Sequence, residues 1–219
     1  MHVKKEHVYA ALDSAAPGPI AEGNVGGGTA MNLFNFKGGT GTASRKLSEE
    51  DGGYTVGVLV QGNFGSRKDL TIAGVPVGTE ITDRMPDTSW KREEAGSIIA
   101  VVATDAPLLP HQLKRLARRV PLGIARMGGY GGNGSGDIFI AFSTGNPGAF
   151  SREANTSIEM VSNDKMNPII HATANATEEA IVNALVAAET MKGRDDNVSF
   201  AIPHDRLQAV LKKYNRLVD

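Results

Sequence analysis

The pattern of apolar and polar positions divides the chain into extended and helical segments. Residues 54–61, with the sequence YTVGVLVQ, are rich in β-branched side chains and are bounded by glycines, so they predict a strand. Residues 97–103 (SIIAVVA) form a continuous apolar run, which is typical of a strand buried on both faces. Residues 138–143 (IFIAFS) form a similar run and predict another buried strand.

Three other segments repeat apolar side chains at helical spacing, within residues 6–15, 113–117 and 207–214. The second of these helices should end or kink at Pro121, because a proline inside a helix removes a hydrogen bond. A fourth helix is predicted to open at Thr177. Threonine is a suitable N-cap residue, and the two glutamates that follow suit the first turn of a helix.

Shorter strands are predicted at residues 158–161, 169–173 and 200–203, together with a strand pair around Gly74. Residues 79–94 are polar and predict an exposed loop. Too many strands are adjacent in sequence for strict alternation of strands and helices. The fold class that fits best is therefore a layered α/β (α+β) sandwich.

The composition fits a single domain spanning residues 1–219. The hydrophobic content of 41% is enough for a sizeable core. The 23 basic and 24 acidic residues nearly cancel, so bulk charge attracts neither nucleic acid nor anionic membranes. The lack of cysteine excludes disulfides and thiol catalysis. Because no apolar stretch reaches the length of a membrane span and no signal peptide is visible, we expect a cytoplasmic protein.

The 26 glycines concentrate in three segments, 23–28, 38–41 and 128–136, which suggests functional loops. The first segment lacks the lysine and hydroxyl residue of a phosphate-binding loop, so a nucleotide cofactor is not expected. The five histidines are scattered without HExxH spacing, so no metal is expected either. The basic residues within 114–119 have no aromatic partners, which is typical of a solvated helix face and not of a nucleic-acid surface.

The third glycine segment carries a candidate nucleophile, Ser135, directly before the strand at 138–143. A turn before a strand is the ordinary explanation of such a Gly-Ser-Gly sequence. Ser135 is not the serine of an esterase elbow, because Asn133 stands where that motif requires glycine. Cleavage of the Gly134–Ser135 bond would, however, give Ser135 a free α-amine that can act as its base. The same hydroxyl could make the cut by attacking the Gly134 carbonyl.

Six ordered segments resemble the DmpA-type self-cleaving aminopeptidases, which comprise L-aminopeptidase/D-esterases and β-peptidyl aminopeptidases. They are GNVGGGT (23–29), FKGGTGTASR (36–45), VLVQGNFG (58–65), AGVPVG (73–78), ATDAPL (103–108) and NGSGDI (133–138). The resemblance extends over nearly the whole chain. It implies an αββα sandwich of the N-terminal-nucleophile type. It also implies cleavage between Gly134 and Ser135 into an α chain, residues 1–134, and a β chain, residues 135–219.

The resemblance further implies that the enzyme releases N-terminal residues from peptides, amides or esters through a Ser135 acyl-enzyme. Asn63, at the end of a predicted strand, is our candidate oxyanion donor, with a turn residue as the alternative. Thr177 and Glu179 match the hydroxyl and carboxylate that relatives place beside the nucleophile, where they would orient its amine; a plain helix cap is the alternative. Phe34 falls about where some relatives carry a tyrosine near the oxyanion.

The family pattern also includes a segment that precedes the equivalent of His2 and contributes strands and part of the substrate pocket. We therefore expect a shortened chain whose exposed apolar edges favour a homo-oligomer. Two other functions stay open: a non-catalytic remnant or interaction subunit of the same fold, and an endo-amidase acting on longer polyamides. The sequence does not indicate whether L-, D- or β-residues are preferred.

Overall fold

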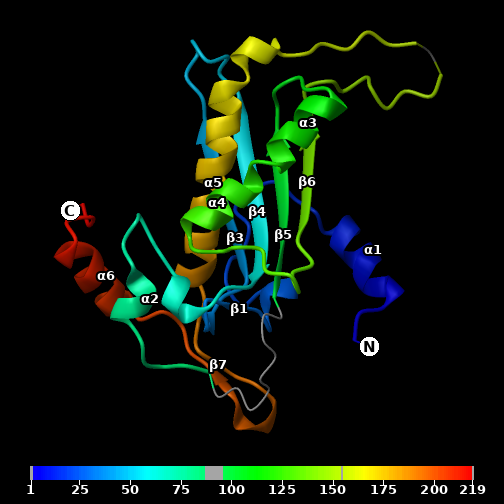
Figure 1. Cartoon of the computed structure of the whole chain (residues 1–219). Coiled ribbons are helices and arrows are strands. Elements are labelled where there is room, and N and C mark those ends of the chain that lie inside the picture. Colours follow the sequence, from blue (N-terminus) through cyan, green and yellow to red (C-terminus); the bar gives the residue numbers. More distant parts are fainter. Residues whose placement is uncertain (1, 87–95, 154, 219) are drawn as a thin grey trace.

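A computed structural model of the protein describes residues 2–86, 96–153 and 155–218. Its centre is a four-stranded mixed sheet in the order β3-β4-β5-β6 (Figure 1). The first three strands run antiparallel, whereas β5 and β6 run parallel. The strands of this sheet are β3 (Thr40–Lys46), β4 (Thr55–Asn63), β5 (Ser97–Thr104) and β6 (Ile138–Ser143). Two small hairpins pair β1 (Asn32–Leu33) with β2 (Phe36–Lys37) and β7 (Met191–Lys192) with β8 (Val198–Ser199).

Helices cover one face of the sheet. The described helices are α1 (Lys5–Asp13), α2 (Val77–Glu80), α3 (Pro110–Ala117), α4 (Val120–Arg126), α5 (Asn167–Val186) and α6 (His204–Lys213). The longest of them, α5, packs on β3 and β4, and α4 packs on α5 (Figure 1). Gly41 on β3 permits this approach, because a side chain there would collide with the backbone carbonyl of Ala180. Within the described residues no helix has the length and apolar character needed to cross a bilayer.

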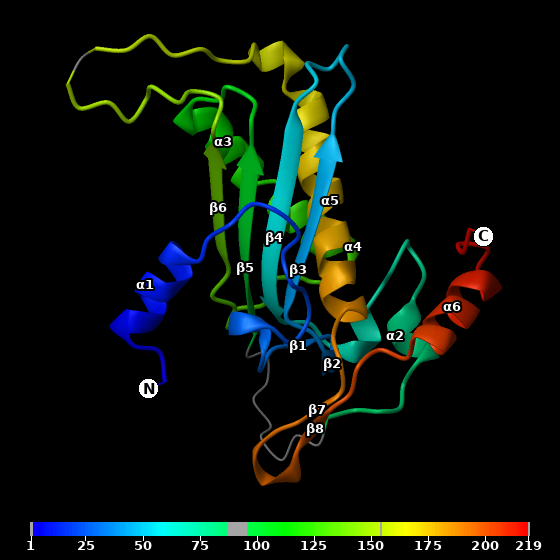
Figure 2. The same cartoon turned by 180° about the vertical axis from the view of Figure 1, so that it is seen from behind.

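The sheet is buried on the helical face and open on the other. Alternate residues of β4 are buried, as the pleat of a strand requires. On the opposite face Ile99, Ile138, Ile140 and Phe142 are between 41% and 52% exposed. Figure 2 shows these strands with no described helix packed over them. The expectation that residues 97–103 are buried on both faces is therefore wrong for the described part of the chain.

Several short strand predictions are also wrong. Residues 158–161 form no strand, residues 169–173 belong to α5, and residues 200–203 precede α6 without pairing. Around Gly74 only an isolated bridge is formed. The physical reason is clearest for α5, which is packed by the sheet and by α4. Its apolar residues therefore occur on several sides, and the helical period is hidden.

The predicted start of a helix at Thr177 is wrong for the same reason. Helix α5 begins at Asn167, with Pro168 in its first turn, and Thr177 lies in its interior. The break at Pro121 is confirmed, because α3 ends before it and Pro121 lies in the first turn of α4. Within the loop predicted at residues 79–94, the first two residues belong to α2, and residues 87–95 lie outside the described residues.

Candidate active site

The segment 128–137 joins α4 to β6 and is fixed at both ends by backbone contacts. At its start the amides of Gly128 and Gly129 donate to carbonyls in the last turns of α4. Gly128 has a φ of 91° and packs so closely on the backbone of Asp69 that a side chain would collide with its carbonyl. At the other end the amide of Gly136 donates to the Ser97 hydroxyl at 3.0 Å. The segment is thus held against β5 directly beside Ser135.

Ser135 is half-buried, and its hydroxyl has a defined partner. Its Oγ donates to Oδ1 of Asp137 at 2.6 Å. The same carboxylate oxygen accepts the backbone N–H of Ile98 at 3.1 Å, so β5 fixes the position of the Asp137 side chain. The Ser135 amide donates to the carbonyl of Gly132 at 2.9 Å and closes a tight turn. The backbone on both sides of the hydroxyl is therefore ordered by hydrogen bonds.

Ser135 faces a cavity of about 360 Å³, a size that suits a small ligand. The polar side chains that line it are Asn32, Asn35, Asn63, Ser66, Asp69, Tyr130, Ser135 and Asp137. Among the described residues that line it none is basic, whereas two are carboxylates. The cavity therefore combines a hydroxyl, amide groups and a negative charge.

Asn63, the candidate oxyanion donor, lines the same cavity from the end of β4. It is the last residue of β4 and not part of the following turn. Its Oδ1 accepts the backbone N–H of Asn32 at 3.0 Å, which fixes the plane of the amide. Among the described residues no acceptor contacts its Nδ2 group. The Oδ1 of Asn32 is buried and has no hydrogen-bond partner among the described residues, so this oxygen can accept a hydrogen bond from a ligand in the cavity.

A buried arginine shapes the wall of the cavity near Asn35. Phe34 and Asn35 have φ values of 51° and 59°, a left-handed backbone that is uncommon for residues other than glycine. Arg67 is only 4% exposed and donates to the carbonyls of both residues at 3.0 and 2.7 Å. Burial lowers the pKa of Arg67 to about 10. Phe34 itself is fully buried against Phe64 and does not line the cavity, so it lies behind the wall.

The two other glycine segments meet around a buried lysine. The Nζ of Lys37 donates to the carbonyls of Gly28, Met31 and Gly38 at 3.2, 2.6 and 2.7 Å. Lys37 is 1% exposed, and its burial lowers its pKa to about 8. These glycine segments thus form a packed structure beside β1 and β2.

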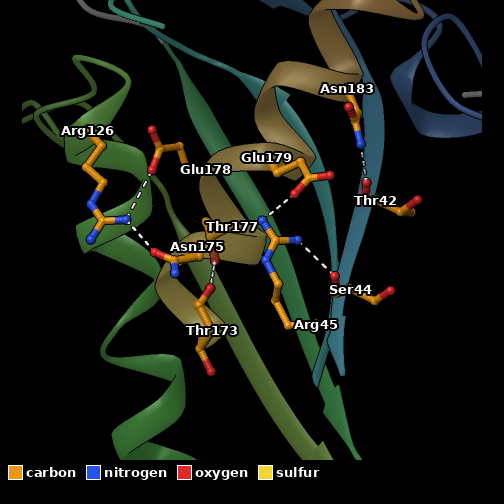
Figure 3. Close-up of polar contacts among 10 residues, drawn as sticks. All are labelled: Thr42, Ser44, Arg45, Arg126, Thr173, Asn175, Thr177, Glu178, Glu179 and Asn183. Carbon is orange, nitrogen blue, oxygen red and sulfur yellow. Dashed lines mark hydrogen bonds and ion pairs between the residues drawn. The ribbon is translucent and has the colours of Figure 1, made fainter. Parts of the chain in front are cut away.

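Thr177 and Glu179 are not among the residues that line the cavity. Figure 3 shows the polar contacts that they make on α5. Thr177 is fully buried, and its hydroxyl donates to the carbonyl of Thr173 at 2.8 Å within α5. Glu179 is exposed and forms an ion pair with Arg45 on β3. Glu178 points to the other side, toward Arg126 on α4. The structure therefore brings Ser135 and Asn63 together, but not Thr177 and Glu179 with them.

The sequence analysis did not assign roles to Asp137, Asn32 or Asn35. A carboxylate two residues after a candidate nucleophile was a usable signal for Asp137. Its position, however, depends on the contact with Ile98 of β5, which no local pattern reveals. Asn32 is the first residue of β1, and Asn35 lies in the turn between β1 and β2. Asn35 has a left-handed backbone, which asparagine tolerates better than most residues.

A mixed sheet with helices on one face, and a serine beside a cavity three residues before a strand, fit the N-terminal nucleophile fold class. Solved structures agree with this class. The L-aminopeptidase D-Ala-esterase/amidase of Ochrobactrum anthropi, described as a new variant of that fold, matches with a TM-score of 0.89 and 50% identity over 99% of this chain and 59% of its own. A β-aminopeptidase of Burkholderia sp. matches with a TM-score of 0.84 and 47% identity, over 97% and 59%.

The chain belongs to peptidase family S58, whose sequence profile matches residues 1–199. The beta-peptidyl aminopeptidase BapA of Sphingosinicella microcystinivorans is 53% identical over 99% of this chain and 58% of its own length. BapA of Sphingosinicella xenopeptidilytica is 47% identical, over 95% and 54%. The resemblance found in the six sequence motifs is confirmed. The chain spans a little more than half the length of these relatives.

Proposed function

We propose that the protein is a self-processing serine aminopeptidase or amidase that releases N-terminal residues from peptides, amides or esters. One observation carries the proposal: the Ser135 hydroxyl lies in a cavity with the amide of Asn63, immediately after the Gly134 carbonyl. Membership of a peptidase family whose relatives are named aminopeptidases supports the reaction class.

In the first stage the Ser135 hydroxyl attacks the carbonyl of Gly134 and the acyl group moves from nitrogen to oxygen. Water then hydrolyses the ester and separates residues 1–134 from residues 135–219. Glycine at position 134 leaves the attacked carbonyl without steric hindrance, and the ordered turn at Ser135 holds the hydroxyl next to the bond.

In the second stage the freed α-amine of Ser135 accepts the hydroxyl proton, and Oγ attacks the substrate carbonyl. The Nδ2 group of Asn63 donates to the oxyanion that develops. A single donor of this kind contributes about 10²- to 10³-fold to turnover in serine hydrolases. The bond between the carbonyl carbon and the leaving group then breaks, and the leaving amine or alcohol takes the proton from the Ser135 amine. Water hydrolyses the acyl-enzyme and releases the N-terminal residue of the substrate.

The charge of the cavity supports an exopeptidase. A substrate of an aminopeptidase presents a cationic amino terminus, and the carboxylates of Asp69 and Asp137 give the cavity a complementary negative charge. An endo-amidase has no cationic terminus to bind, so this feature favours the aminopeptidase over that alternative.

The role that the family resemblance gives to Thr177 and Glu179 stays a separate proposal. Neither residue lines the cavity in the uncut chain, so this role requires the Ser135 amine to approach α5 after cleavage. Assembly into a homo-oligomer also stays a prediction. The open apolar face of the sheet supports it, because exposed apolar patches favour association.

The test compares aminoacyl p-nitroanilides that carry a free amine with the same compounds after N-acetylation. We expect the chain to hydrolyse the free-amine compounds, Ser135→Ala to be inactive, and N-acetylation to abolish turnover. Equal hydrolysis of the acetylated compounds would favour an endo-amidase. No hydrolysis of any compound by the purified chain would favour the non-catalytic remnant.

A further inference from the structure

A buried lysine lies behind the candidate oxyanion donor, and the proposed reaction gives it no role. Lys37 is 1% exposed and is not among the described residues that line the cavity. It belongs to the hairpin of β1 and β2, which lies at the end of the sheet where β4 ends at Asn63 (Figure 2). Burying an ammonium group costs free energy unless its hydrogen bonds are made, so its partners indicate what it does.

One peptide group connects Lys37 to Asn63. The Nζ of Lys37 donates to the carbonyl of Met31 at 2.6 Å. The N–H of the same peptide group, which belongs to Asn32, donates to Oδ1 of Asn63 at 3.0 Å. The ammonium, the peptide group and the side-chain amide therefore form a continuous chain of hydrogen bonds. At the far end of this chain is Asn63 Nδ2, the group proposed to donate to the oxyanion.

The direction of these hydrogen bonds strengthens the last donor. A bond from an ionised donor is short and about twice as strong as one between neutral groups, and the distance to the Met31 carbonyl fits that class. The charge at this carbonyl polarises the peptide group, so the Asn32 N–H becomes a better donor. The same effect at Oδ1 of Asn63 makes Nδ2 a better donor. The bonds also fix the plane of the amide before the reaction, which is what makes an oxyanion donor effective.

The other contacts of this peptide group supply position without charge. The Gly38 amide also donates to the Met31 carbonyl, at 3.1 Å, so the peptide group keeps one bond when the ammonium is removed. Arg67, the other buried cation at this hairpin, donates to the carbonyls of residues 34 and 35 and not to that of Met31. Lys37 is therefore the described cation in contact with the peptide group that holds Asn63.

We infer that Lys37 is a positioning residue for the oxyanion. Its ammonium group, acting through the peptide group between Met31 and Asn32, orients and polarises the amide of Asn63. The inference rests on the proposed function, because that function makes Asn63 the oxyanion donor. Lys37 forms no covalent bond and keeps its proton on Nζ throughout the reaction.

The first test is the turnover of Lys37→Met at pH 7, measured with an aminoacyl p-nitroanilide. Cooperative strengthening is about 10–30% per hydrogen bond, and one oxyanion donor contributes about 10²- to 10³-fold to turnover. We therefore expect kcat to fall by about two- to tenfold. KM should change by less than about twofold, because the oxyanion develops only in the transition state. Rates are expressed per cleaved chain, which intact mass counts.

The same substitution in an Asn63→Ala background separates positioning from general damage. Without the amide there is nothing to polarise, so Lys37→Met should then change kcat by less than about 1.5-fold. The matched control is Arg67→Met, which removes the other buried cation and should lower kcat by the same factor in both backgrounds. An equal factor for Lys37→Met in both backgrounds would show a purely structural role and overturn the inference.

NMR of an uncut Ser135→Ala chain decides the question without a change at Lys37, and so also covers variants that do not fold or are not cleaved. Burial lowers the pKa of Lys37 from 10.5 to about 8, and no charged neighbour contributes to this shift. When Lys37 loses its proton, the Nδ2 resonance of Asn63 should move with the same midpoint as the Cε resonance of Lys37.

Two comparisons make this titration specific. The titratable side chains that line the cavity are those of Asp69, Tyr130 and Asp137, and a shift caused by one of them would not share the Lys37 midpoint. The side-chain amide of Asn146, which is bonded to the main chain of Glu159 through both Nδ2 and Oδ1, is the control and should not follow that midpoint. The inference fails if the Asn63 resonance stays in place while Lys37 loses its proton. It also fails if Lys37 titrates near 10.5, as an exposed lysine does.

The outcomes separate this inference from the proposed function. If the wild-type chain cleaves and hydrolyses the p-nitroanilide, but Asn63 does not follow Lys37, the inference fails and the proposed function stands. If the wild-type chain hydrolyses no substrate, there is no oxyanion for Lys37 to act on and both are wrong. A shared midpoint, together with a Lys37→Met effect that disappears in the Asn63→Ala background, supports both.

Discussion

The loop before Ser135 should tolerate a side chain at Gly131 but not at Gly128. Both glycines have a left-handed backbone, with φ of 59° and 91°. Beyond that they differ. The nearest atom to an added Cβ at Gly131 is a side-chain oxygen of Asp137 at 3.6 Å, an ordinary contact, whereas a Cβ at Gly128 would collide with the main-chain carbonyl of Asp69. A comparison of alanine variants at these two glycines therefore separates the cost of backbone strain from the cost of close packing.

The expected magnitudes follow from these contacts. Alanine in a left-handed backbone costs about 1–2 kcal/mol, and Gly131→Ala should cost no more than this. Gly128→Ala must in addition displace the Asp69 carbonyl or the end of α4, where the Thr71 amide donates to the Met127 carbonyl at 3.0 Å. Each such hydrogen bond contributes about 1 kcal/mol, and an unsatisfied buried group costs about 1–3 kcal/mol more. We therefore expect Gly128→Ala to cost about 4 kcal/mol in total.

Urea denaturation in a Ser135→Ala background measures this difference, because all chains then stay uncut. The free energy of unfolding should fall by about 2 kcal/mol or more in Gly128→Ala relative to Gly131→Ala. Equal free energies of unfolding in the two variants would refute the packing of the loop on Asp69.

Three further predictions concern buried charges and α5. Arg67→Met should lower the free energy of unfolding, measured in urea, by about 4 kcal/mol, because it leaves buried carbonyls unsatisfied. Arg206→Met is the control and should change the free energy of unfolding little, because Arg206 forms only a solvent-accessible ion pair with Asp83. The pKa of Lys37 is lowered by burial from 10.5 to about 8, so between these pH values the unfolded chain binds this proton and the folded chain releases it. The free energy of unfolding should therefore rise with pH across that interval by up to about 3 kcal/mol. If the difference in free energy of unfolding between the wild-type chain and Lys37→Met does not change with pH, this reasoning is contradicted. Glu179→Gln should lower turnover of a p-nitroanilide by at least about tenfold if the Glu179 carboxylate acts on the Ser135 amine. Arg45→Met breaks the same ion pair and should not lower turnover. Equal activity of both variants and the wild-type chain would show that Glu179 is not part of the site.

Three of the four strands of the central sheet could be predicted from the sequence because each is an apolar run with clear ends, whereas β3 (TGTASRK) is not. Residues 54–61 and 97–103 correspond to β4 and β5, and residues 138–143 to β6. The longest helix, α5, was only partly predicted, since its first turns were interpreted as a strand. Its residues pack against β3, β4 and α4 at once, so the sequence there lacks the polar stripe that marks a surface helix.

In the candidate site, too, some residues are marked by the local sequence, whereas others are placed by contacts with residues distant in sequence. Ser135 and Asn63 line one cavity, and each lies in or near an end of a strand that the sequence marks clearly. The position of the Asp137 side chain depends on Ile98 of β5, which is distant in sequence, so no local pattern reveals it. Arg67 supports the cavity wall through carbonyls of residues 34 and 35, a contact between main chain and side chain that leaves no sequence motif.

The intact mass of the purified chain tests the central claim most directly. The account predicts that the wild-type chain gives two fragments, residues 1–134 and 135–219, and that Ser135→Ala gives one uncut chain. Circular dichroism of both proteins serves as the control for folding. A folded wild-type chain that keeps its full mass, or a Ser135→Ala chain cut at the same bond, would contradict the account.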